Sequence, residues 1–276
     1  MPRAWLNPAG GLRYHLRALR AGRLWQPFRE ALARWFPVFD VPGLRAVLVG
    51  PSAGYTFPDA FLSQFAALTV LEPDPIACAL LGRRLRRLGV TFQFEHADRL
   101  VAPLLFGGAG LSELLRADPS ACLIFGNVLG QTRFLLPDPD FERFKSAFRQ
   151  QITPLLARRA WLGFHDRLSG NFAPSFEQPY TVPSRLDDQA VLRELYPSVE
   201  GTAMRELFDH QSEGFFPSGG AHSYFHWQID RARHHLIEGV MSGPGSWQPE
   251  ALRQPGARES VSEPFPSPGP GFSDRL

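Results

Sequence analysis

Cysteine is scarce in this chain, and the few cysteines present are not arranged as metal ligands. The two cysteines, Cys78 and Cys122, both lie within apolar runs. Cysteines in such runs behave as small buried hydrophobes, so we expect neither a disulfide nor a thiolate metal site. The histidines also lack the spacing that zinc ligands show, which predicts that the chain holds no metal.

Long hydrophobic runs and a strong excess of one charge are also missing. No stretch approaches the ~20 apolar residues that span a bilayer, and the first residues contain no apolar core of a signal peptide. The net charge is +2, and Lys145 is the only lysine. This balance favours neither a nucleic acid nor a membrane as partner. Because a membrane span and a signal peptide are missing as well, we expect a cytoplasmic protein.

What the chain does contain is enough apolar material for a large core, arranged as alternating strands and helices. Of its 276 residues 44% are hydrophobic and 12% aromatic. Apolar runs predict strands at 45–50, 67–71, 90–95, 121–126 and 160–165, and helical periodicity predicts helices at 58–66, 75–88, 110–117 and 138–157. Such alternation predicts an α/β protein, with a Rossmann-like, doubly wound, mostly parallel sheet.

Other segments flank this alternation. Two runs at 223–229 and 234–241 surround a short polar turn and predict a C-terminal antiparallel hairpin. Residues 11–36 are amphipathic, and we expect their leucine-rich stripe to pack on the sheet domain. We therefore divide the chain into an N-terminal helical segment, an α/β domain with an insertion that holds one helix near 186–196, and a Pro- and Gly-rich tail expected to be disordered. Their bounds are 1–43, 44–242 (insertion 166–222) and 243–276.

The first two predicted strands end in residues suited to a nucleotide. The first is followed by Gly50-Pro51-Ser52-Ala53-Gly54, and the second by Glu72. Glycines let ligand atoms approach a backbone, and an acid at the next strand end can accept hydrogen bonds from ribose hydroxyls. This pair of strand ends is typical of a nucleotide-binding α/β unit.

On these residues the chain resembles the class I S-adenosylmethionine-dependent methyltransferases, whose first motif is a strand followed by G-x-G-x-G. Gly50 and Gly54 match the outer glycines, Ser52 stands in place of the middle one, and Glu72 matches the acid of the second motif. The resemblance implies S-adenosylmethionine as cofactor and adds Asp98, after the third strand, as an adenine contact. A cap of the helix that follows is an equal alternative for Asp98.

The same resemblance places the methyl acceptor beyond the fourth and fifth strands. Asn127 follows the fourth strand, where amino-methylating members carry Asn or Asp, and it alone matches their motif. His165 ends the fifth predicted strand beside Asp166, where it could serve as a general base. The resemblance implies a methyltransferase with a small-molecule acceptor rather than a protein or nucleic acid. Alternatively, Asn127 holds a tight turn and His165 bonds only to loop backbone.

Two other functions remain open from the sequence. Gly50–Gly54 also reads G-x-S-x-G, the nucleophile elbow of serine hydrolases, with Ser52 as the nucleophile. The elbow requires a helix directly after the turn, whereas Tyr55–Pro58 intervene here. The altered glycine loop also leaves room for a non-catalytic, Rossmann-like protein that binds a nucleotide or a partner.

Overall fold

The centre of the molecule is one mixed sheet. We describe a computed structural model, in which residues 11–199, 206–217 and 220–242 are described. The nine strands found in those ranges are β1 (Arg45–Val49), β2 (Ala67–Leu71), β3 (Thr91–Glu95), β4 (Cys122–Gly126), β5 (Trp161–Gly170), β6 (Tyr180–Val182), β7 (Phe208–Asp209), β8 (His222–Gln228) and β9 (His234–Met241). The predicted disorder of 243–276 falls outside the described residues.

The order of the strands confirms the predicted fold class. They run β3-β2-β1-β4-β5-β9-β8-β6, with β7 paired to β5. The first five strands pair in parallel, whereas β9 and β8 close the sheet as an antiparallel hairpin. The chain thus has an α/β fold with a Rossmann-like, mostly parallel sheet. Strand order reverses between β1 and β4, the point at which open α/β sheets bind ligands beyond the carboxyl ends of their strands.

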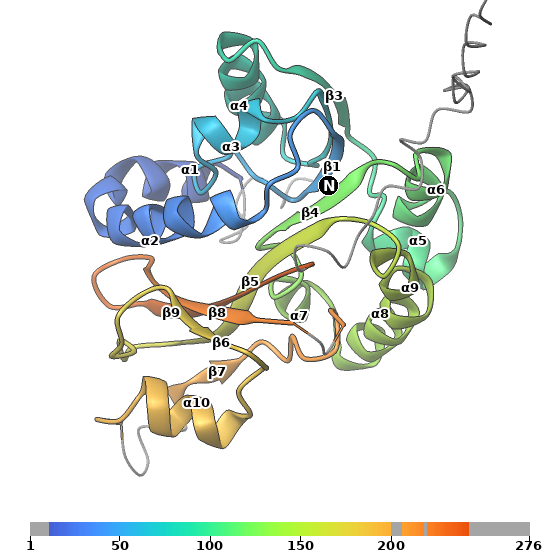
Figure 1. The fold of residues 1–276 in the computed structure, drawn as a ribbon. Coiled ribbons are helices and arrows are strands. Elements are labelled where there is room, and N and C mark those ends of the chain that lie inside the picture. The colour runs from blue at the N-terminus through green and yellow to red at the C-terminus, as the bar shows by residue number, and fades with distance from the viewer. Residues whose placement is uncertain (1–10, 200–205, 218–219, 243–276) are drawn as a thin grey trace, which may run out of the picture.

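Helices cover both faces of the parallel strands (Figure 1). One face buries its apolar side chains against α2 (Gly22–Trp35), α3 (Asp59–Ser63) and α4 (Pro75–Arg87). The other face packs on α5 (Val101–Phe106), α6 (Leu111–Ala117), α8 (Asp138–Gln151) and α9 (Thr153–Leu156). The short α7 (Thr132–Leu135) follows β4. None of the described helices combines the length and apolar composition needed to cross a membrane.

The N-terminal segment splits at Gly22, and its first half packs differently from the prediction. Helix α2 lies on β8, as expected of an amphipathic helix. In α1 (Gly11–Arg20), by contrast, the predicted leucine stripe faces outward, with Leu12 50%, Leu16 41% and Leu19 74% exposed. The buried positions of α1 are instead Gly11, His15 and Ala18. Polar contacts of the glycine-loop region, described below, orient this helix.

The predicted end of the fifth strand is also wrong. The apolar run stops near residue 165, yet β5 continues to Gly170 because β9 pairs with it as far as His234. A register shift between Asp166 and Leu168 interrupts this pairing. The insertion then adds β6 to β8 and β7 to β5, and α10 (Asp188–Leu195) confirms its predicted helix.

Arg159 connects three elements at the amino edge of the sheet. Its buried guanidinium donates to the carbonyl oxygens of Leu155 (3.1 Å), Leu115 (3.0 Å) and Ala121 (3.2 Å). These oxygens belong to α9, α6 and the residue before β4. A buried acceptor without a donor costs about 1–3 kcal/mol.

Replacing this guanidinium should therefore destabilise the domain as a whole. We expect Arg159→Met to lower the free energy of unfolding by at least about 2 kcal/mol, because apolar volume is kept while the donors are lost. Chemical denaturation measures the change. The neighbouring Arg158→Met is the matched control, because Arg158 is exposed and should leave stability within error. Equal stability of the two variants would contradict the role given to Arg159.

Candidate functional site

The glycine loop after β1 is a tight turn packed against protein. Gly50, Ser52 and Gly54 all have positive φ, at 64°, 52° and 73°. A Cβ on Gly50 would lie 2.6 Å from Cβ of Val128, and one on Gly54 would lie 2.9 Å from a methyl carbon of Leu81. Glycine is therefore required at both positions by the backbone conformation and by neighbouring protein atoms. From the sequence alone, these glycines were expected to let a ligand approach the backbone.

Glu72 ties the end of β2 to this loop. Its Oε2 accepts the N–H of Ser52 at 2.8 Å, and its Oε1 accepts the N–H of Asp74 at 3.0 Å. The side chain is buried, and this burial raises its pKa to about 7 although both N–H groups oppose the shift. Each carboxylate oxygen retains a second lone pair, so the group can still accept hydroxyl donors.

Asp98 acts as a helix cap. One carboxylate oxygen accepts the N–H groups of Leu100 (2.9 Å) and Val101 (2.8 Å), and the other accepts that of Ala102 (2.9 Å). The residue is exposed at the start of α5. These bonds match the capping alternative, and contact with adenine stays a prediction.

Helix α1 lies across the outside of the glycine loop, and hydrogen bonds to Asp74 hold it there. Oδ2 of Asp74 accepts the N–H of Gly11 at 2.8 Å and lies 3.0 Å from Nε2 of His15. Nδ1 of His15 in turn lies 2.9 Å from the Tyr55 hydroxyl. Burial would raise the pKa of Asp74, but the N–H groups of Gly11 and Ile76 and the His15 imidazole lower it.

Tyr14 of α1 packs against aromatic side chains beside the glycine loop. Its ring lies 6.1 Å from that of Tyr55 and 5.8 Å from that of Trp25, measured between centroids. Burial raises the pKa of its phenol, and the nearby Tyr55, Asp166 and Glu72 raise it further. Tyr14 is thus near enough to Glu72, which follows β2, and to Asp166, within β5, for their charges to raise the pKa of its phenol.

Asn127 lies where the sequence placed it, in the turn after β4, with φ at 59°. Its Oδ1 accepts the N–H of Asp166 at 2.8 Å, and its Nδ2 donates to Oδ2 of Asp166 at 3.2 Å. Asn127 therefore both forms the turn and joins β4 to β5. Since Val128 also packs over Gly50, this turn adjoins the glycine loop.

His165 does not join this group, which corrects the sequence prediction. Successive side chains on a strand point to opposite faces. The His165 imidazole lies beside Phe216, with Nε2 3.5 Å from Oε2 of Glu238, and the side chain is buried. Asp166, one position later, is the β5 residue that meets Asn127.

His165 instead belongs to a network of charged side chains around Glu238, in the β8–β9 hairpin. Glu238 of β9 lies 2.8 Å from Nδ1 of His222 and 3.3 Å from Nε of Arg185. Burial would raise the pKa of Glu238, but His165, His222 and Arg185 hold it well below its usual range. These partners pair the carboxylate at the junction of β5, β9 and β8, and the loss of one of them would leave a buried charge uncompensated.

Two histidines that the sequence did not assign to the site surround Asp166. Nδ1 of His235, on β9, lies 2.8 Å from Oδ1 of Asp166. His210, directly after β7, places Nδ1 3.0 Å from the Gly130 carbonyl oxygen and Nε2 3.0 Å from Oγ of Ser169. Because Asp166, His210 and His235 lie far apart in the sequence, no local motif could have revealed their proximity.

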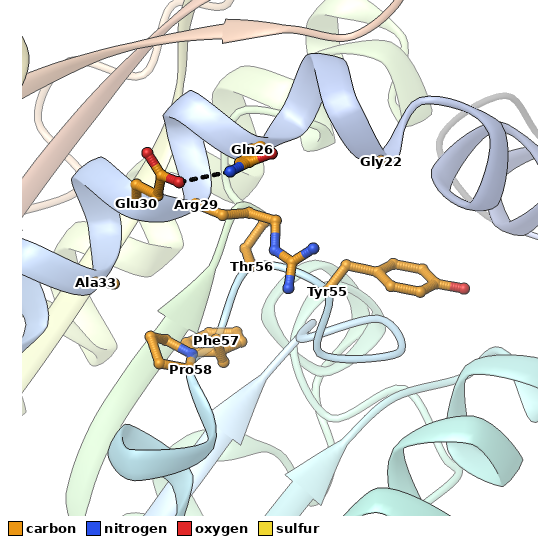
Figure 2. Close-up of a pocket in the computed structure, with 9 residues that line it drawn as sticks. All are labelled: Gly22, Gln26, Arg29, Glu30, Ala33, Tyr55, Thr56, Phe57 and Pro58. Atoms are coloured by element: carbon orange, nitrogen blue, oxygen red, sulfur yellow. Dashed lines mark hydrogen bonds between the residues drawn. The ribbon is translucent and has the colours of Figure 1, made fainter.

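A pocket lies elsewhere, between α2 and the segment after the glycine loop (Figure 2). It measures about 390 Å³ and is lined by Gly22, Gln26, Arg29, Glu30, Ala33, Tyr55, Thr56, Phe57 and Pro58. Arg29 extends from α2 toward Tyr55 and Thr56 (Figure 2). No residue predicted for the cofactor or acceptor lines this pocket.

Comparison with known proteins gives distant likenesses only. No protein-family model and no curated protein matches this sequence. Among solved structures, the N-methyltransferase NodS from Bradyrhizobium japonicum WM9 is 10% identical, with a TM-score of 0.39 over 80% of this chain and 98% of that one. The magnesium protoporphyrin IX methyltransferase ChlM from Synechocystis PCC 6803 is 12% identical, with a TM-score of 0.37 over 87% and 89%. Likenesses this distant do not say what this chain binds.

Asp74 should control the attachment of α1. In Asp74→Ala, the bonds to Gly11 and His15 are lost, and we expect amide hydrogens of residues 11–20 to exchange about tenfold faster, as expected for the loss of roughly 1.4 kcal/mol of local stability. Hydrogen exchange read by mass spectrometry measures this. Asp187→Ala is the control, because Asp187 caps α10 and makes no contact with α1. Unchanged exchange in α1 would show that other contacts hold the helix.

Proposed function

We propose that this chain binds S-adenosylmethionine at the carboxyl edge of its sheet and methylates a small-molecule acceptor. The observation that carries the proposal is the contact of Glu72 with Ser52, which joins the acid of β2 and the loop of β1 into one site. Asn127 and Asp166 lie at the same edge, on the neighbouring strands β4 and β5. The parallel order of the strands produces this meeting.

Each part of the edge has a distinct task in this proposal. Glu72 would accept the ribose hydroxyls through its remaining lone pairs, and the loop at Ser52 would face the rest of the cofactor. The bound cofactor supplies a methyl group on a sulfonium, activated for in-line displacement. Asn127 and Asp166 would orient the acceptor, and Tyr14 with α1 would exclude water from the reacting groups.

The serine hydrolase alternative loses its support. The positive φ of Ser52 is compatible with an elbow, but α3 begins only at Asp59 rather than directly after the turn. Within the described residues, no hydrogen bond joins the Ser52 hydroxyl to a histidine, and its backbone N–H is held by Glu72. An activated nucleophile needs a base within hydrogen-bond reach.

One observation favours a non-catalytic protein as the second candidate. Side chains of Val128 and Leu81 lie so close to Gly50 and Gly54 that they leave no room for a Cβ there. A protein whose site is closed in this way could keep its fold without binding a cofactor. Calorimetric titration with S-adenosylhomocysteine separates the two, because the second candidate binds none.

The cofactor proposal predicts a specific loss in Glu72→Gln. We expect the affinity for S-adenosylhomocysteine to fall about tenfold, because a neutral amide accepts hydroxyl hydrogen bonds more weakly than a carboxylate. Isothermal titration calorimetry measures the affinity, and a thermal melt verifies that the variant folds. Glu113→Gln, an exposed acid of α6, is the matched control. Equal affinities in both variants would remove Glu72 from the site.

The raised pKa of Glu72 adds a pH dependence. With a pKa of about 7, the free protein holds Glu72 largely protonated below that pH, whereas ribose hydroxyls bind best to the ionised form. Affinity for S-adenosylhomocysteine should therefore increase between about pH 6 and pH 8 in the wild type. The increase should be absent from the Glu72→Gln variant. Parallel curves for the two proteins would contradict the proposed contact.

A further inference from the structure

Three potential metal ligands converge beside the proposed acceptor site. Asp166 comes from β5, His210 from the insertion after β7, and His235 from β9. One ligand atom from each lies within 4.8 Å of the others. Asp166 and His210 are fully buried, whereas the side chain of His235 retains 15% exposure. A buried set with one side open to solvent offers both ligands and an entry path.

Two of the three side chains already have the charge that a cation requires. Burial would raise the pKa of Asp166, but His235, His210 and Asn127 lower it, so the carboxylate is ionised at neutral pH. Burial lowers the pKa of His210, which favours its neutral imidazole. Metal ligation needs a deprotonated carboxylate and neutral imidazoles, and Asp166 and His210 meet this requirement.

Outer contacts also orient these ligands. The Gly130 carbonyl can only accept, so Nδ1 of His210 carries the hydrogen and Nε2 keeps its lone pair. The carboxylate of Asp166 is held by the side-chain amides of Asn127 and Gln131. Metal-bound histidines commonly donate their other N–H to a backbone carbonyl, and ligating carboxylates are hydrogen-bonded in the same way.

Two contacts must change, namely that between Asp166 and His235 and the hydrogen bond that Nε2 of His210 accepts from the Ser169 hydroxyl at 3.0 Å. Oδ1 of Asp166 and Nδ1 of His235 lie 2.8 Å apart with a hydrogen between them, because an ionised carboxylate can only accept. A cation between the two would take the place of this hydrogen, and the two ligand atoms would move apart to admit it. The displaced proton would pass to solvent or to Nε2 of His235.

We propose that Asp166, His210 and His235 bind one Zn²⁺ ion. Two imidazoles and one carboxylate form a ligand set typical of zinc, with a fourth position left for water or an oxygen of a substrate. Magnesium and calcium prefer all-oxygen sites, which this cluster does not offer. The proposal goes beyond methyl transfer, and its test needs neither cofactor nor acceptor.

A second histidine pair on the same hairpin provides an internal control. Nε2 of His226 lies 2.9 Å from Nδ1 of His234, on the face opposite to His235. No carboxylate completes this pair within the metal-ligand groups of the described residues. Burial and His234 lower the pKa of His226 to about 4, so the pair is also neutral and tests whether two imidazoles suffice.

The test is titration of the full chain, freed of metal by a chelator, with Co²⁺ and then Zn²⁺. Co²⁺ bound to this cluster should give visible absorption bands with one ion per chain, and Zn²⁺ should displace it. His210→Ala and His235→Ala should each weaken Co²⁺ binding by about 100-fold or more. His234→Ala should leave it unchanged, and thermal melts verify that all variants fold.

The partly exposed His235 keeps the test decisive even where a variant at a buried position fails to fold. A wild type that binds no Co²⁺ would overturn the proposal. So would binding that survives His235→Ala or is lost in His234→Ala. Titration with S-adenosylhomocysteine on the same metal-free protein keeps the two proposals distinct, because cofactor binding requires none of these ligands.

Discussion

Asp166 places a charge in the interior of the sheet, and the surrounding elements are arranged to satisfy it. The cost of burying a carboxylate is offset only when it is fully hydrogen-bonded. Here the turn after β4 supplies Asn127 and Gln131, and β9 supplies His235. His210, brought by the insertion, packs beside them against Gly130. Strand β5 therefore extends beyond its apolar run, the hairpin pairs along it, and the insertion returns to the sheet at this point.

A second carboxylate, Asp74, connects the N-terminal segment to the same edge. It caps α4 through Ile76 while holding Gly11 and His15 of α1. Tyr14, on the same helix, thereby packs beside Tyr55 and Trp25. The open pocket lies next to α2 and is also lined by Tyr55.

The sequence predicted the strands and helices that are marked by apolar runs. It failed where polar contacts between residues distant in the chain determine the structure. The runs of β1, β2 and β4 predicted their strands to within a residue, and the strand ends placed Glu72 and Asn127 at one edge. The continuation of β5 past residue 165 depends on pairing with β9, which carries no local signal. The same pairing decides that Asp166, not His165, faces Asn127. The outward stripe of α1 likewise follows from its contact with Asp74, more than fifty residues away.

The central claim is that the edge holding Glu72, the glycine loop and Asp166 binds S-adenosylmethionine. A crystal structure of the chain grown with S-adenosylhomocysteine tests it most directly. The account predicts the ribose hydroxyls within hydrogen-bond distance of Glu72, the sulfur facing Asn127, and the Tyr14 ring displaced from its present position. An empty edge at saturating ligand, or a ligand seated in the pocket lined by Arg29, would contradict it.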